Sequence, residues 1–184
     1  MEPGSARIAV IGLGNVLMGD DGFGPYAAHL LERSFAWPAD VQVAELGTQG
    51  LDLTPYVRGA EALIVLSSVH RGGAPGVLHR LGRDEVMDPG LPEREPALRH
   101  SPYEPGVRGL VLTLEFTGGA PRDVWVVGAE PESVELDGGL SDRVRPALQR
   151  AVDEALAILL TLGVTPLGRA PGTPPAPWWE IRGA

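Results

Sequence analysis

The fold is decided by the stretch RIAVIGLGNVLMGDDGFGPYAAHLLERSF, which spans residues 7–35. Its beginning, Arg7–Gly12, is an apolar, β-branched run that ends in glycine, as is typical of a buried strand. After a polar loop, apolar side chains recur at helical spacing from Gly22 to Phe35, and Pro25 falls in the first turn, where its missing N–H costs little. The stretch therefore predicts a strand, a long loop and a helix.

The rest of the chain repeats this alternation. Further strands are predicted over Val41–Leu46, Ala62–Leu66, Val77–Leu81 and Asp123–Ala129. Helices are predicted over Leu51–Arg58, over Val107–Phe116 and from the N-cap Ser141 to Leu162. Apolar strands separated by helices favour a mostly parallel sheet with helices on both faces, in which ligands bind beyond the carboxyl ends of the strands.

The chain of 184 residues is long enough for one hydrophobic core, so we expect a single domain over residues 1–163. Residues 164–184 are a proline-rich tail that we expect to be extended. Its Trp178 and Trp179 either pack back on the domain or dock on a partner. Asp88–Gly106 is rich in proline and charge, which predicts a long surface loop.

The charge balance excludes several classes of function. There are 24 acidic and 15 basic residues, and a net charge of −9 argues against a protein that binds nucleic acid. The chain contains no cysteine and no lysine, which rules out thiol nucleophiles, Schiff-base chemistry and a P-loop lysine. No apolar run is long enough for membrane insertion, and no secretory signal is recognisable, so we expect a cytoplasmic protein.

The loop from Gly12 to Gly24 contains two adjacent acids, Asp20 and Asp21, directly before the first helix. A glycine-rich turn after the first strand suggests a nucleotide site. However, the third glycine of that fingerprint is missing, and the acids stand where a phosphate needs donors. The acids either complement the helix dipole or place a hard oxygen ligand in the cleft.

Three further loops contain polar side chains of possible chemical use. ELGTQG, at residues 45–50, includes Thr48, which is suited to cap the next helix. SSVHRGGAPG, at 67–76, includes His70, and RHSPYEPG, at 99–106, includes His100 and Tyr103. Taken singly, each loop is typical of a surface turn and each histidine of a solvated side chain.

Taken together, these loops resemble those of the hydrogenase maturation endopeptidases, which trim the C-terminus of the large subunit of nickel–iron hydrogenases. The resemblance spans residues 7–162 and is strongest in IGLGNVLMGDDGFGP, where Asn15 follows the glycine turn and the two acids precede the helix. ELGTQG, RGGAPG and FTGGAPRDVWVVGAEPES are similar to further segments of the family. The resemblance implies a three-layer α/β/α sandwich.

Members of that family bind a metal, taken to be the nickel of the immature large subunit. The ligands are an acid in the first loop, an aspartate at the end of the third strand and a histidine in the loop before the next helix. The resemblance places the acid on Asp21, with Asp20 orienting the loop. It places the other two positions on Ser67 and Tyr103, whose hydroxyl groups are poor ligands for a divalent metal at neutral pH.

Two histidines could replace the missing ligands. His70 is three residues after Ser67, and His100 is three residues before Tyr103, so a shifted loop could supply both imidazoles. The alternative is that both are ordinary solvated residues. The substrate-cleft positions implied by the resemblance are Asn15, Asp20, Gly47, Thr48 and Gly50.

The resemblance thus implies an endopeptidase of the aspartic or metal-dependent type, with Asp21 as its catalytic residue and metal ligand. Its partner is the large-subunit precursor of a nickel–iron hydrogenase, and nickel is recognised in that substrate. One alternative is a non-catalytic escort that binds the large subunit during assembly. A third hypothesis, a nucleotide-binding enzyme, uses the turn at Gly12–Gly14.

Overall fold

The computed structural model describes residues 6–47, 53–89, 106–136, 138–168 and 177. Its strands are β1 (Ile8–Leu13), β2 (Phe35–Ala36), β3 (Val41–Gly47), β4 (Ala62–Ser68), β5 (Leu78–Gly82), β6 (Asp123–Ala129) and β7 (Leu167–Gly168). Its helices are the 3₁₀ helix η1 (Gly19–Gly22), α1 (Phe23–Ser34), α2 (Thr54–Val57), α3 (Arg83–Met87), α4 (Val107–Thr117) and α5 (Ala147–Thr161).

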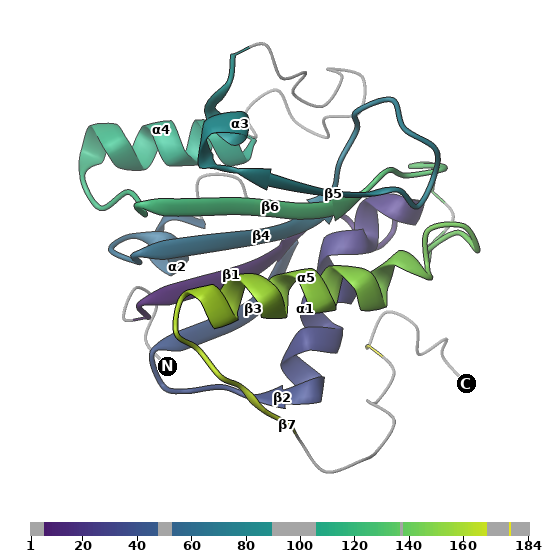
Figure 1. Ribbon diagram of the computed structural model, residues 1–184. Helices are drawn as coiled ribbons and strands as arrows, with labels where there is room; N and C mark the ends of the chain where they lie inside the picture. The colour runs from purple at the N-terminus through teal and green to yellow at the C-terminus, as the bar shows by residue number, and fades with distance from the viewer. Residues whose placement is uncertain (1–5, 48–52, 90–105, 137, 169–176, 178–184) are drawn as a thin grey trace.

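The strands form a central sheet in the order β3-β1-β4-β6-β5 (Figure 1). Neighbouring strands are parallel from β3 to β6, and β5 runs antiparallel to β6 at the edge. The expectation of a mostly parallel sheet is confirmed. Because the parallel strands share one direction, the loops that follow β1, β3, β4 and β6 all emerge at the same edge, which we call the carboxyl edge.

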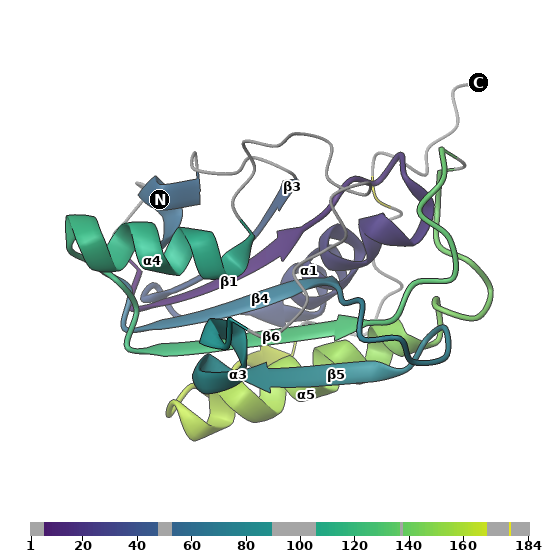
Figure 2. The ribbon, with the colours of Figure 1, turned by 90° about the horizontal axis from the view of Figure 1, so that it is seen from above.

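Two hydrophobic cores lie on opposite faces of the sheet. Ile8 and Val10 of β1 pack with α1 and α5 in one core, whereas Ala9 and Ile11 pack with α2 and α4 in the other. Figure 2 shows α4 and α5 on the two sides of the sheet. A strand with period-two alternation that is apolar at every position therefore serves both cores, which explains why these runs lack polar residues.

Two glycines allow α1 to approach the sheet closely. A Cβ atom at Gly12 would lie 2.5 Å from the carbonyl oxygen of Gly24, and a Cβ at Gly24 would overlap the carbonyl oxygens of Leu13 and Leu66. The first turn of α1 therefore rests directly on the ends of β1 and β4. This contact holds the acids of η1 against the carboxyl edge.

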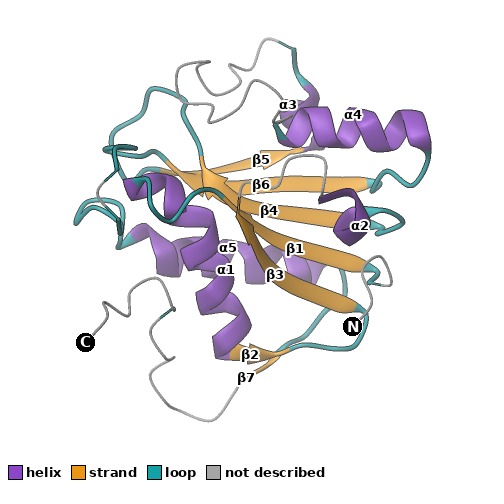
Figure 3. Ribbon diagram, turned by 180° about the vertical axis from the view of Figure 1, so that it is seen from behind, coloured by secondary structure: helices purple, strands orange, loops and turns teal. Residues whose placement is uncertain are grey.

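Three details differ from the sequence-based expectations. The last helix begins at Ala147 rather than beside Ser141, because Pro146 has no N–H to donate to a helical hydrogen bond. Ser141 caps only the turn before it, where its Oγ accepts from the Val144 N–H at 3.3 Å. The short helix α3 and the antiparallel pair of β2 and β7 were not predicted; Figure 3 shows that pair beyond the end of α1.

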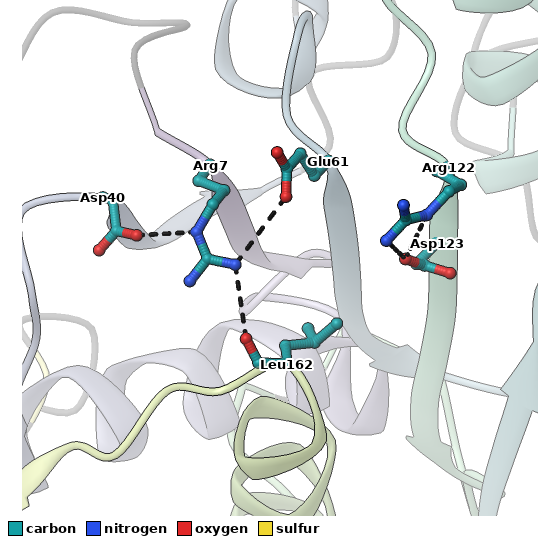
Figure 4. A network of polar contacts seen from close by, with 6 residues as sticks. All are labelled: Arg7, Asp40, Glu61, Arg122, Asp123 and Leu162. Carbon is teal, nitrogen blue, oxygen red and sulfur yellow. Dashed lines mark hydrogen bonds and ion pairs between the residues drawn. The ribbon is translucent and has the colours of Figure 1, made fainter.

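The opposite edge of the sheet is tied together by Arg7 (Figure 4). Its guanidinium donates to Asp40 before β3 at 2.8 Å and to the Leu162 carbonyl after α5 at 3.4 Å, and it lies 3.9 Å from Glu61. The hydrogen bond from Arg7 lowers the pKa of Asp40. Within the described ranges, no helix has the length and apolarity that crossing a bilayer requires.

Candidate functional site

The glycine turn after β1 joins the first two loops of the carboxyl edge. The Gly14 N–H donates to the Gly47 carbonyl at 3.1 Å, and a Cβ at Gly14 would overlap the carbonyl oxygen of Asp21. The next N–H group, that of Asn15, donates to the Asp21 carboxylate. Because both N–H groups already have protein acceptors, this turn does not offer them to a phosphate, which argues against the nucleotide hypothesis.

Asp21 is fully buried where η1 meets the ends of β1 and β4. One carboxylate oxygen accepts from the Asn15 N–H at 2.9 Å, and the other accepts from the Ser68 hydroxyl at 3.1 Å. The side chain of Asn15 accepts in turn from the Leu17 N–H at 3.0 Å. The acid that the resemblance selected is therefore held in a defined orientation by its own loop and by β4.

The serine that reaches Asp21 is Ser68, which sequence reasoning missed. Successive side chains of β4 alternate between the two cores, and Leu63 and Val65 belong to the core under α2 and α4. This alternation assigns Ser67 to that face and Ser68 to the face of α1, where Asp21 lies. The alternation itself was visible in the sequence and, together with the position of α1, identifies Ser68.

Asp20 has a different task from its neighbour. Its carboxylate accepts from the N–H groups of Glu132 (2.8 Å), Ser133 (3.2 Å) and Ser141 (2.7 Å) and from the Ser141 hydroxyl (2.9 Å). The Asp20 N–H also donates to the Ser133 carbonyl at 2.9 Å. We call this set of contacts the Asp20 latch. It fastens the loop between β6 and α5 to the first loop, so the resemblance-based role of Asp20 in orienting the loop agrees with its contacts.

Glu130, directly after β6, is a buried acid that sequence reasoning also missed. Its Oε1 atom accepts from the N–H groups of Arg71 (2.5 Å) and Gly73 (3.0 Å) and lies 3.0 Å from Nε2 of His79. Burial raises the pKa of Glu130, but the Gly73 and Arg71 N–H groups and the His79 imidazole together outweigh burial and leave the pKa below its ordinary value. The signal was an acid immediately after an apolar strand.

We expect Glu130→Gln to lower the free energy of unfolding by about 2 kcal/mol at pH 7, because an amide replaces the charged acceptor of the turn. A lowered native pKa stabilises the fold fully above the unfolded-state pKa, and this contribution is lost as the pH falls through the native pKa, below about pH 4.5. Urea denaturation from pH 7 to pH 3 measures the difference, which should shrink with acidity.

The matched control for Glu130→Gln is Glu32→Gln, at an exposed position of α1. It should change the free energy of unfolding by less than about 0.5 kcal/mol at every pH. A difference between wild type and Glu130→Gln that stays constant over the whole pH range would contradict the assigned role of the carboxylate.

His70 follows β4 and belongs to the turn that Glu130 holds. Its Nε2 atom is buried and has no hydrogen-bond partner within the described part of the chain. Buried polar atoms without partners are uncommon in native proteins, and a neutral imidazole nitrogen is a good metal ligand or proton acceptor. Among the residues that the structure describes, no three His, Cys, Asp or Glu side chains converge to hold a metal. His100, Tyr103, Thr48 and Gly50 lie outside the described residues.

The chain is similar in sequence to proteins of hydrogenase maturation. A family model described as Hydrogenase maturation protease (HycI) matches residues 25–158. The hydrogenase expression/formation protein HupM of Azotobacter chroococcum mcd 1 is 37% identical over 165 residues, covering 89% of this chain and 77% of that protein. The Hydrogenase 2 maturation protease of Escherichia coli K12 is 32% identical over 167 residues, covering 89% and 96%.

The same similarity extends to solved structures. The hydrogenase maturating endopeptidase HybD from E. coli superposes with a TM-score of 0.77 at 32% identity, over 89% of this chain and 98% of that one. A hydrogenase 2 maturation peptidase from Thaumarchaeota archaeon SCGC_AB-539-E09 gives a TM-score of 0.62 at 32% identity, over 83% and 97%. The expected three-layer α/β/α sandwich is confirmed by these neighbours and by the helices on both faces of the sheet.

Proposed function

This chain belongs to the hydrogenase maturation protease family and is an endopeptidase, and we propose that it removes the C-terminal peptide from the large-subunit precursor of a nickel–iron hydrogenase. The observation that supports this substrate best is the position of Asp21. The similarity covers nearly the whole length of the E. coli endopeptidase. Within that shared fold, the first-loop acid lies at the carboxyl edge and is oriented by Asn15 and Ser68.

Hydrolysis of a peptide bond requires a base for the attacking water, a group that polarises the scissile carbonyl, or both. The chain has no cysteine, so a thiol nucleophile is not available. An ionised carboxylate accepts protons and ligates metals, and Asp21 is the acid so placed. We propose that Asp21 is the catalytic carboxylate and that His70, through its unpartnered Nε2, is the second donor toward the substrate.

Nickel enters this proposal as part of the substrate. A precursor that already contains nickel brings ligands of its own, so the protease needs to add only one or two. One carboxylate and one imidazole suit that task, whereas a resident metal would need a fuller ligand set from the protein itself. The family names favour cleavage over the non-catalytic escort.

The test is to mix the purified chain with purified nickel-loaded precursor and to look for the released C-terminal peptide by mass spectrometry. We expect release with nickel-loaded precursor and none with nickel-free precursor. The E. coli Hydrogenase 2 maturation protease acting on its own precursor in the same buffer is the positive control. Absence of release while that control cleaves would refute the proposal, and binding without release would favour the escort.

A further inference from the structure

Two large apolar side chains are exposed at the carboxyl edge, on the two loops that the Asp20 latch joins. Leu17, after the glycine turn, is 58% exposed, and Leu136, between β6 and α5, is 78% exposed. In contrast, Leu140 of the same second loop is buried. Single exposed leucines are common on protein surfaces, but two on adjoining loops beside a candidate catalytic acid form a local apolar feature. We call Leu17 and Leu136 the rim pair.

The backbone of both loops is fixed, so the rim pair is presented rather than loosely attached. The Gly138 N–H donates to the Leu17 carbonyl at 3.4 Å, and the latch holds Glu132 and Ser133. A Cβ at Gly19 would lie 2.8 Å from the Ser133 carbonyl oxygen, so the two loops are in close contact. Loops that are already ordered lose little conformational entropy when a ligand binds.

The rim pair is continuous with the candidate active site. The Leu17 N–H donates to the Asn15 side chain at 3.0 Å, and the Asn15 N–H donates to Asp21 at 2.9 Å. One residue therefore positions both the exposed leucine and the acid. A polypeptide whose scissile bond lies at Asp21 passes close to this rim.

The charge around the rim pair indicates the chemistry of the occupant. Glu132 and Glu135 are exposed on the second loop, and Glu132 pairs with Arg143 at 3.0 Å. The exposed loop is therefore acidic on balance, in a chain with a net charge of −9. Such a surface favours a partner that combines apolar side chains with positive charge.

We propose that the rim pair is a docking surface for the large-subunit precursor and takes a large apolar side chain, close to a basic residue, in the segment that flanks the scissile bond. This inference rests on the proposed function and adds to it the residues that recognise the substrate. The surface acts on binding rather than on the chemical step, because neither leucine has a group that transfers a proton.

The test compares two double variants of the full chain acting on nickel-loaded precursor. We expect Leu17→Ala with Leu136→Ala to raise KM about tenfold or more, with kcat within about twofold of wild type, because binding that is equal in ground and transition states changes KM alone. The matched control is Leu160→Ala with Leu167→Ala, at positions that are 57% and 72% exposed but lie on α5 and β7. It should leave both constants unchanged. Thermal melting should be unaltered in both variants.

Direct binding of the precursor, measured by titration calorimetry, separates the two proposals. Peptide release by wild type with unchanged KM and Kd in the rim variant overturns the docking surface and leaves the proposed function standing. No release by any protein, with affinity lost only in the rim variant, overturns the function and supports the docking surface. A wild-type dimer that the rim substitutions dissociate, seen by light scattering, identifies a second copy of the chain as the occupant and overturns the inference.

The positive charge of the occupant has its own readout. Attraction between an acidic rim and a basic segment is screened by salt, so KM should rise between low and high ionic strength. The Glu135→Gln variant should show a weaker rise than wild type. A KM that is independent of salt in both proteins overturns the assignment of a basic residue to the substrate.

Discussion

The Asp21→Asn variant should release the C-terminal peptide at least about a hundredfold more slowly than wild type, because general-base or metal-ligand action requires the carboxylate. The fold should survive this change. The new amide oxygen can accept from the Asn15 N–H, and its NH₂ group can donate to Ser68, whose hydroxyl is able to accept as well. The measurement is the rate of peptide release per folded molecule, with folding checked by circular dichroism.

The matched control for Asp21→Asn is Asp84→Asn, an exposed position in the first turn of α3 near the opposite edge of the sheet. It should process the precursor at the wild-type rate. Cleavage by Asp21→Asn at that rate would remove Asp21 from the catalytic machinery, while leaving the family membership and the fold untouched.

The Asp20→Asn variant should lose about 3 kcal/mol of unfolding free energy, because an amide cannot replace the carboxylate of the latch. Each of the two carboxylate oxygens accepts at least two of the four hydrogen bonds or sits opposite a backbone N–H, so the amide NH₂ would face a donor in either orientation. Chemical denaturation gives the change as a shift of the transition midpoint at constant slope.

Asp142→Asn is the matched control for the latch, since Asp142 is exposed and immediately follows Ser141. Its free energy of unfolding should lie within about 0.5 kcal/mol of wild type. A midpoint for Asp20→Asn that equals the midpoint of this control would contradict the structural role of the latch. The two neighbouring aspartates are thus expected to affect different measurements, stability for Asp20 and peptide release for Asp21.

Local sequence patterns were sufficient for most of the fold. The apolar run Ala62–Leu66 and the helix face from Gly22 to Phe35 are dictated by nearby residues, and the structure contains both nearly as predicted. The orientation of β5 was not accessible in this way, because an apolar strand has the same pattern in either direction. The start of α5 was misplaced because the N-cap preference of Ser141 was weighted above the missing donor of Pro146.

The site was less predictable, because its contacts join residues far apart in the chain. The acid pair was recognised from its motif, but nothing local distinguishes Asp20 from Asp21. Their separation appears only when the loop after β6 returns to meet the first loop. Glu130 likewise acts on a turn that lies more than fifty residues earlier, at Arg71 and Gly73.

The chemistry of the Asp20 latch has an evolutionary consequence. Three of its four donors are backbone N–H groups, at residues 132, 133 and 141, and every amino acid except proline supplies such a group. Most outward-facing side chains of that loop can therefore diversify without loosening it. A gene duplicate could acquire a new preferred client by changing a few codons there, while the hydrolytic apparatus next door is inherited intact.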